Sequence, residues 1–205
     1  MHFLLLAAAL IAAQGKPSDS TQGKPFYKVE IDNAWVHVVR EVVPPHEKTE
    51  PHKHLESVTV WMTDSRQHKA GDVSHALEGL HVEDNSSDHA VEEIVIELKT
   101  NAPPSKAIAL DPVALDPKYH SVAFENARVR ALRTTLEPGI KSPLHEHPHY
   151  VVVYLTDLHT TMTLGDGREV DNPRHPGETA WRDYMKHSTL NIGTQTAVEI
   201  QVELK

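Results

Sequence analysis

The sequence predicts an all-β protein built from two similar units, and three observations support this prediction. Short segments rich in β-branched residues recur along the chain, such as VHVVREVV and RVRALRTTL. Residue patterns of the first half return in the second half at a fixed spacing, as they do in proteins with internal repeats. After the N-terminal apolar run, no segment of about ten or more residues has strong helical periodicity.

An apolar segment at the N-terminus predicts export. Residues 3–13 (FLLLAAALIAA) are too few to span a bilayer but are typical of the core of a secretory signal. Ala13 and Gly15 are small residues at the positions that a cleavage site needs, and a polar segment follows. We predict a signal peptide over 1–15 and a secreted or periplasmic mature chain without a membrane span. The alternative is a buried helix of the fold.

The first part of the repeat has a shift of 93 residues. NAWVHVVR over 33–40 aligns with NARVRALR over 126–133, and this shift continues without a gap to Asp64 and Asp157. The second part has a shift of 106 residues, and three motifs carry it: Gly71-Asp72 with Gly177-Glu178, the histidines His81 and His187, and the segments 97–99 and 203–205 (both ELK).

The difference between the two shifts predicts the domain layout. The second copy carries additional residues within HTTMTLGDGREVDNPRH, a pattern that predicts a β-hairpin. The segment NAPPSK and two Asp-Pro turn signals separate the copies. We therefore expect a first domain over 16–100, a linker over 101–117 and a second domain over 118–205. Units of this size bury modest cores alone, so we expect them to pack against each other.

Composition narrows the range of functions. Lys and Arg total 20 against 29 Asp and Glu, a net charge of -9 that argues against a nucleic-acid partner. The chain has no cysteine, which excludes disulfides, thiolate metal sites and a cysteine nucleophile. Nucleotide-binding loops and serine-hydrolase motifs are also missing from the sequence. The unusual count is 16 histidines, which favours metal binding or acid–base chemistry.

Each copy carries a His-x-His pair on a predicted strand. Side chains alternate along a strand, so both imidazoles of a pair lie on the same face. One such pair is weak evidence in a histidine-rich chain, but two pairs at equivalent repeat positions are strong evidence. A third histidine follows each pair in a His-x-x-x-Asn pattern. We predict two divalent-metal sites, formed by His52, His54 and His81 and by His145, His147 and His187. The alternative is that these histidines only make structural hydrogen bonds.

These motifs resemble those of the cupin superfamily, and the chain resembles a two-domain cupin, or bicupin. Gly139 stands ahead of His145 at the spacing of the first cupin motif, whereas the first copy has His46 in the place of this glycine. The second motif survives mainly at its end, as His81 with Asn85 and the equivalent His187 with Asn191. The resemblance covers about 26–99 and 118–205. It implies two tandem jelly-roll β-barrels, each with a pocket for a metal ion or ligand.

One departure from the cupin motif concerns the metal. The motif glutamate is expected four or five residues after the second histidine, where this chain has Val58-Thr59 and Val151-Val152. The resemblance then implies a three-His site, as in thiol dioxygenases, and disfavours manganese decarboxylase or germin-like oxidase chemistry. The ion is left open among iron, manganese, zinc, nickel and copper.

Other polar residues recur at equivalent positions. Glu56 and His149 lie two residues beyond each histidine pair, so strand alternation predicts that they face the ligands. Each is a candidate fourth ligand, a group that orients a ligand, a proton carrier or an exposed rim residue. Arg40 and Arg133 are candidates for anion binding or for a structural ion pair.

The remaining aromatic and histidine residues receive structural assignments. We expect Trp61 and Tyr154 to pack on the strand face opposite the ligands. Four histidines have no matching partner in the repeat, and we expect them at the surface: His68, His120, His159 and His175.

Three functions remain open from the sequence. The first is a secreted, metal-dependent oxygenase-type enzyme acting on a small molecule, with no catalytic residue assigned. The second is a non-catalytic cupin that binds a sugar or organic acid, with a structural metal or none. The third has one active and one degenerate barrel. The second copy is the better candidate for activity because it keeps Gly139 and Pro176-Gly177. We expect a monomeric bicupin or a homodimer.

Overall fold

The computed structural model describes residues 26–205, and the predicted signal peptide lies outside them. The first half of the described chain forms seven strands: β1 (Tyr27–Asp32), β2 (Val36–Val43), β3 (His52–His54), β4 (Ser57–Trp61), β5 (Val73–Ala76), β6 (Gly79–His81) and β7 (Val91–Leu98). A short helix, α1 (Pro112–Leu115), lies between the halves. The second half forms nine strands: β8 (His120–Glu125), β9 (Val129–Leu136), β10 (His145–His147), β11 (Tyr150–Tyr154), β12 (Leu158–Leu164), β13 (Glu169–Arg174), β14 (Thr179–Arg182), β15 (Met185–Asn191) and β16 (Ala197–Leu204).

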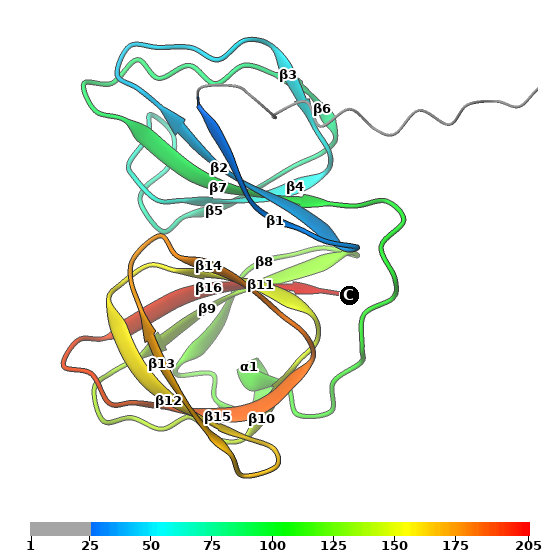
Figure 1. Ribbon diagram of the computed structural model, residues 1–205, viewed down its shortest axis with the longest axis vertical. Helices are drawn as coiled ribbons and strands as arrows, with labels where there is room; N and C mark the ends of the chain where they lie inside the picture. The colour runs from blue at the N-terminus through cyan, green and yellow to red at the C-terminus, as the bar shows by residue number, and fades with distance from the viewer. Residues whose placement is uncertain (1–25) are drawn as a thin grey trace, which may run out of the picture.

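The strands form two barrels that lie one above the other (Figure 1). The first barrel has a five-stranded sheet in the order β1-β2-β7-β4-β5, and the pair β3-β6 lies opposite it. The second barrel has the equivalent sheet β8-β9-β16-β11-β14, opposed by the four-stranded sheet β10-β15-β12-β13. The hairpin predicted in the second copy is confirmed, since β12 and β13 pair antiparallel. All pairings between these strands are antiparallel, and many bring together segments far apart in the sequence.

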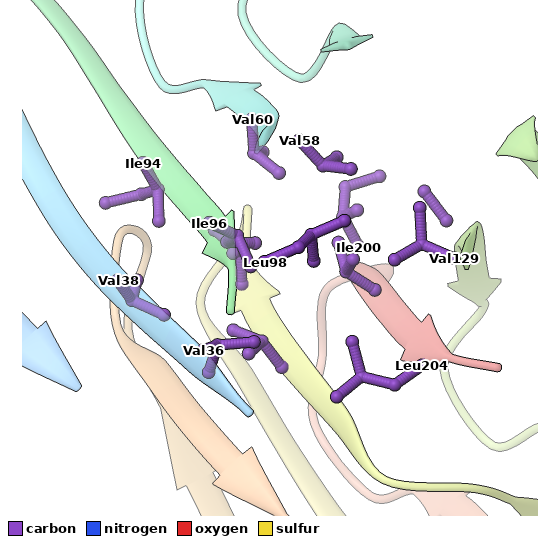
Figure 2. Packing of buried hydrophobic residues seen from close by; sticks show 14 residues of the cluster. Val36, Val38, Val58, Val60, Ile94, Ile96, Leu98, Val129, Ile200 and Leu204 are labelled. Carbon is purple, nitrogen blue, oxygen red and sulfur yellow. The ribbon is translucent and has the colours of Figure 1, made fainter. Parts of the chain in front are cut away.

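The main hydrophobic core lies between the two barrels. Alternate residues of the large sheets point toward the other barrel, such as Ile94 and Ile96 in the first and Ile200 and Val202 in the second, all 0% exposed. Figure 2 shows Ile94, Ile96 and Ile200 among the apolar side chains between strands of both halves. A smaller apolar cluster around Leu136 and Tyr154 lies inside the second barrel. The expectation that the two copies pack against each other is therefore confirmed.

Reciprocal contacts join the barrels at equivalent repeat positions. The guanidinium of Arg40 donates to the backbone oxygen of Gly177, and that of Arg133 donates to the backbone oxygen of Gly71. Arg40 also pairs with Glu30, at 2.6 Å from Nε to Oε1, and with Glu92. Arg40 thus forms the structural ion pair, whereas the contact of Arg133 is the one to the backbone oxygen of Gly71.

Glu56 and His149 form a second reciprocal set, which corrects the prediction that they face the metal ligands. Glu56 accepts from Arg128 at 2.7 Å, and His149 stacks on Trp35 with ring centroids 4.8 Å apart. The prediction is wrong because the strand breaks after each histidine pair: β3 ends at His54 and β10 at His147. Glu56 and His149 lie in the two-residue breaks that follow, outside any strand. Their side chains turn toward the other barrel.

One backbone feature explains the glycine of the first cupin motif. Gly139 has φ +77° and His46, its repeat equivalent, has φ +60°, so both turns need the left-handed region. Histidine is among the non-glycine residues that adopt this region more often than most. The turn before the histidine pair therefore survives in the first barrel without its glycine.

Residues 26–205 contain no helix that is long and apolar enough to cross a membrane.

Candidate metal centres

Strand pairing brings together the two predicted histidine triads. In the first barrel β3 pairs with β6, which places His52 directly opposite His81. In the second barrel β10 pairs with β15 in the same way, with His145 opposite His187. In each triad one ring nitrogen from every histidine lies within 4.8 Å of the others. The structure thus assembles both sets of side chains, and their role as metal ligands stays a prediction.

Hydrogen bonds at Nδ1 orient the paired imidazoles. Nδ1 of His52 is 2.9 Å from the oxygen of Glu50, and Nδ1 of His145 is 2.8 Å from that of Pro143. A carbonyl oxygen can only accept, so each Nδ1 donates its proton, and Nε2 is then the nitrogen that can accept a hydrogen bond or bind a cation. This is the arrangement that metal-binding histidines use.

A buried carboxylate orients the second histidine of each pair. Oε1 of Glu97 lies 2.5 Å from Nδ1 of His54, and Oε1 of Glu203 lies 2.7 Å from Nδ1 of His147. The two glutamates align in the repeat, so the sequence contained this signal, but only contact with the imidazole reveals their role. Burial raises the pKa of Glu203 to about 7, while the Arg130 guanidinium, 2.7 Å away, acts in the opposite direction.

Unpaired buried nitrogens test whether the second triad fits a metal ion. Among the described residues, Nε2 of His147 and Nδ1 of His187 are buried without a hydrogen-bond partner. Leaving such a group unpaired costs about 1–3 kcal/mol, so a ligand is expected to satisfy it. Burial lowers the pKa of both histidines well below the usual value, and the neighbouring histidines add to this. Neutral imidazoles are the form that binds a cation, so the triad fits a divalent ion.

The interior of the second barrel contains a cavity beside its triad. Its wall is partly apolar, with Tyr150, Leu158 and Met162, and partly polar, with Glu199 and Arg182. Nη2 of Arg182 is 3.3 Å from the Tyr154 hydroxyl. Tyr154 also lines this cavity, which corrects the expectation that it packs on the face away from the ligands. The strand break after His147 again reverses the predicted alternation.

His120 lines this cavity. The expectation from the sequence that it lies at the surface is wrong. His120 is 2% exposed, and its ring is 5.0 Å from that of His145. The shift of 93 residues pairs it with Tyr27, whose ring is also 5.0 Å from the equivalent His52. The alignment missed this pair because it began at Asn33, after the first strand. By contrast, His159 and His175 lie at the surface as expected.

The first barrel contains acidic residues that sequence analysis did not single out. Carboxylate oxygens of Glu41, Glu83 and Glu93 lie within 4.8 Å of one another. Glu41 is 0% and Glu93 4% exposed, and Glu83 lies 3.0 Å from Nε2 of His81. Burial raises the pKa of Glu93 well above its usual value, and the other two carboxylates add to this. No periodicity marks these residues, because Glu83 follows β6 while the others lie on β2 and β7.

The buried His120 predicts loss of stability in acid. Burial lowers its pKa from 6.5 to about 4, so the unfolded chain binds a proton that the folded chain does not. The free energy of unfolding therefore decreases as the pH falls from 6.5 to about 4, by about 3 kcal/mol at pH 4. We expect His120→Tyr, which introduces the first barrel's residue, to remove this part of the loss. Urea unfolding of metal-free protein at about pH 7 and pH 4 measures it.

Glu199 and Glu203, whose raised pKa values act in the opposite direction, are present in both proteins and cancel in the comparison. An equal loss of stability in parent and variant would contradict the assignment to His120.

Comparison with known proteins gives structural matches only. No protein-family model and no curated protein matches the sequence. AerE from Microcystis aeruginosa matches with a TM-score of 0.66 and 14% identity, over 90% of this chain and 95% of that one. Oxalate decarboxylase from Bacillus subtilis matches with a TM-score of 0.59 and 14% identity, over 82% of this chain and 68% of that one. The chain has the bicupin fold.

A single cupin domain from Bordetella pertussis also matches, at 22% identity, over 50% of this chain and 95% of that one, with a TM-score of 0.40. The predicted all-β fold of two tandem jelly-roll barrels is confirmed by the strand topology and by the two matches that span most of the chain. At these identities the similarity shows the cupin fold and not the reaction.

Proposed function

We propose that this bicupin binds one divalent metal ion in each barrel, through His52, His54 and His81 and through His145, His147 and His187. The observation that carries this proposal is the convergence of buried imidazole nitrogens, some without any partner in the described chain. Packing alone does not favour such nitrogens, because an unpaired buried polar group destabilises the fold. The matched oxalate decarboxylase from Bacillus subtilis has Mn(II) centres, which supports a metal in this fold.

We further propose that the second barrel is the site of a metal-dependent, oxygenase-type enzyme acting on a small molecule. A divalent ion held by three imidazoles keeps open positions where dioxygen or an oxygenated substrate can bind. The cavity supplies the rest of the site. Arg182 presents a positive charge toward an anionic substrate group, and Tyr150 and Leu158 exclude water. Burial raises the pKa of Glu199 to about 7, so this carboxyl can take up or release a proton near neutral pH.

Metal analysis of the parent protein tests the proposed function. Protein purified without a His tag is loaded in turn with iron, manganese, zinc, nickel and copper, and desalted. We expect about two ions per chain. The ion that is bound most tightly, and consumption of dioxygen by that form with small organic acids or thiols, then narrow the reaction. No bound ion from any of the five metals would overturn the proposal and leave a ligand-binding cupin.

Export completes the proposal. We propose cleavage after residue 15 and a secreted or periplasmic mature chain with domains over 16–100 and 118–205. The apolar run over 3–13 and the small residues at its end support this. The intact mass of the exported protein measures the cleavage point.

A further inference from the structure

Glu83 lies beside the histidine triad of the first barrel and contacts its third histidine. It follows the third histidine of the triad by two residues, and its Oε1 is 3.0 Å from Nε2 of His81. Nε2 of His52 and Nε2 of His54 are 3.1 Å apart. Neighbouring ligands of a six-coordinate ion, each about 2.1 Å from it, lie about 3.0 Å from each other. Both measured separations match this value.

We infer that Glu83 is a ligand of the ion in the first barrel, beside His52, His54 and His81. The inference rests on the proposed function, because it needs an ion at this triad. The carboxylate would come from the segment after β6 and not from β4, where Val58-Thr59 replaces the glutamate of the cupin motif. The first barrel would then offer three imidazoles and one carboxylate despite the loss of that residue.

The surroundings of Glu83 favour a cation. Its carboxylate shares the barrel interior with those of Glu41 and Glu93, and like charges at this range repel each other. A divalent ion bound by Glu83 offsets this repulsion, as bound cations do at other clustered carboxylates. Glu93 is 4% exposed, so its carboxyl group lies inside the barrel with little contact with water.

The second barrel lacks this arrangement. The repeat places Thr134, Thr189 and Glu199 where the first barrel has Glu41, Glu83 and Glu93. One carboxylate therefore replaces three, and the residue equivalent to Glu83 is a threonine. The two metal sites would differ in charge and ligand number, and the first would prefer ions that favour oxygen ligands, such as Mn²⁺.

Manganese titration separates ligation by Glu83 from a general charge effect. The His145→Ala/His147→Ala protein serves as the background, so that only the first barrel binds an ion. Glu83→Gln and Glu93→Gln each replace one carboxyl group of the same interior by an amide of nearly the same shape. The electron paramagnetic resonance signal of free Mn²⁺ gives the Kd. Thermal unfolding of the metal-free proteins checks that they fold, and Glu83→Asp replaces the glutamine variant if that variant does not.

We expect Glu83→Gln to weaken Mn²⁺ binding by more than about 100-fold, which exceeds the 10–100-fold that groups outside the ligand set contribute. Glu93→Gln is expected to weaken it by about 100-fold at most. The absorption spectrum of bound Co²⁺, which reports the ligand set, is expected to change only with Glu83→Gln. Equal weakening by both variants with an unchanged spectrum would overturn the role of Glu83 alone. If the background protein binds no ion, the proposed function fails at the first barrel, and this inference with it.

Discussion

Protein carrying His145→Ala and His147→Ala is expected to retain about one divalent ion per chain where the parent holds about two. The substitution removes two of the three imidazoles that meet inside the second barrel, and a lone His187 cannot hold an ion against dialysis. His52→Ala/His54→Ala is expected to empty the first barrel in the same way. Elemental analysis after loading and desalting measures both losses, and the two double variants combined should hold no ion.

The control for this experiment is His159→Ala/His175→Ala, which removes two histidines of the second barrel that lie at its surface. It should keep the parent's metal content. If the control loses as much metal as the triad variants, the bound metal is adventitious surface metal. If His52→Ala/His54→Ala leaves the metal content unchanged, the first barrel is a scaffold and the protein has one active and one degenerate barrel.

Ile200→Ala is expected to lower the free energy of unfolding by about 2–5 kcal/mol, the range for large-to-small changes in a packed core. Ile200 is 0% exposed and lies in the cluster between the barrels, so its truncation leaves a cavity against strands of both halves. The midpoint of thermal unfolding should fall by about 10 °C in a protein of this size. Because the barrels share this core, we expect one cooperative transition before and after the change.

Ile192→Ala is the matched control, since it makes the same chemical change in the same barrel at a side chain that is 47% exposed. It should shift the midpoint by less than about 2 °C, as substitutions away from the core do. Two separate transitions, of which Ile200→Ala moves only the later one, would show that the barrels are stabilised independently.

The repeat made most of the fold predictable. The register from Asn33 to Asp64, and again from Gly71 to Lys99, fixed which strands are equivalent in the two halves. The His-x-His pairs, with the third histidine of each copy, then indicated the residues of each site. Contacts between side chains from distant strands were not predictable in this way. Glu97 and Glu203 lay in the alignment, but their contact with an imidazole depends on a pairing over many residues.

Two kinds of error came from local rules. Strand alternation was extended across the break after each histidine pair, which misplaced Glu56, His149 and Tyr154. Side chains alternate only within a continuous strand, so the rule does not hold across the two residues of each break. The alignment also started too late to include β1 and β8, so His120 was separated from its equivalent, Tyr27. Glu83 belongs to no periodic pattern in the sequence, because it lies in the loop that follows β6.

The reciprocal contacts between the barrels have a consequence for the chain's origin. Two sets of contacts are reciprocal. Arg40 contacts Gly177 and its equivalent Arg133 contacts Gly71, while Trp35 contacts His149 and its equivalent Arg128 contacts Glu56. This is the geometry of a two-fold symmetric homodimer. When two copies are joined in one chain, the same interface is kept, and its two sides can differ in sequence. In this chain one side is an aromatic stack and the other an ion pair, a difference that two identical subunits cannot have.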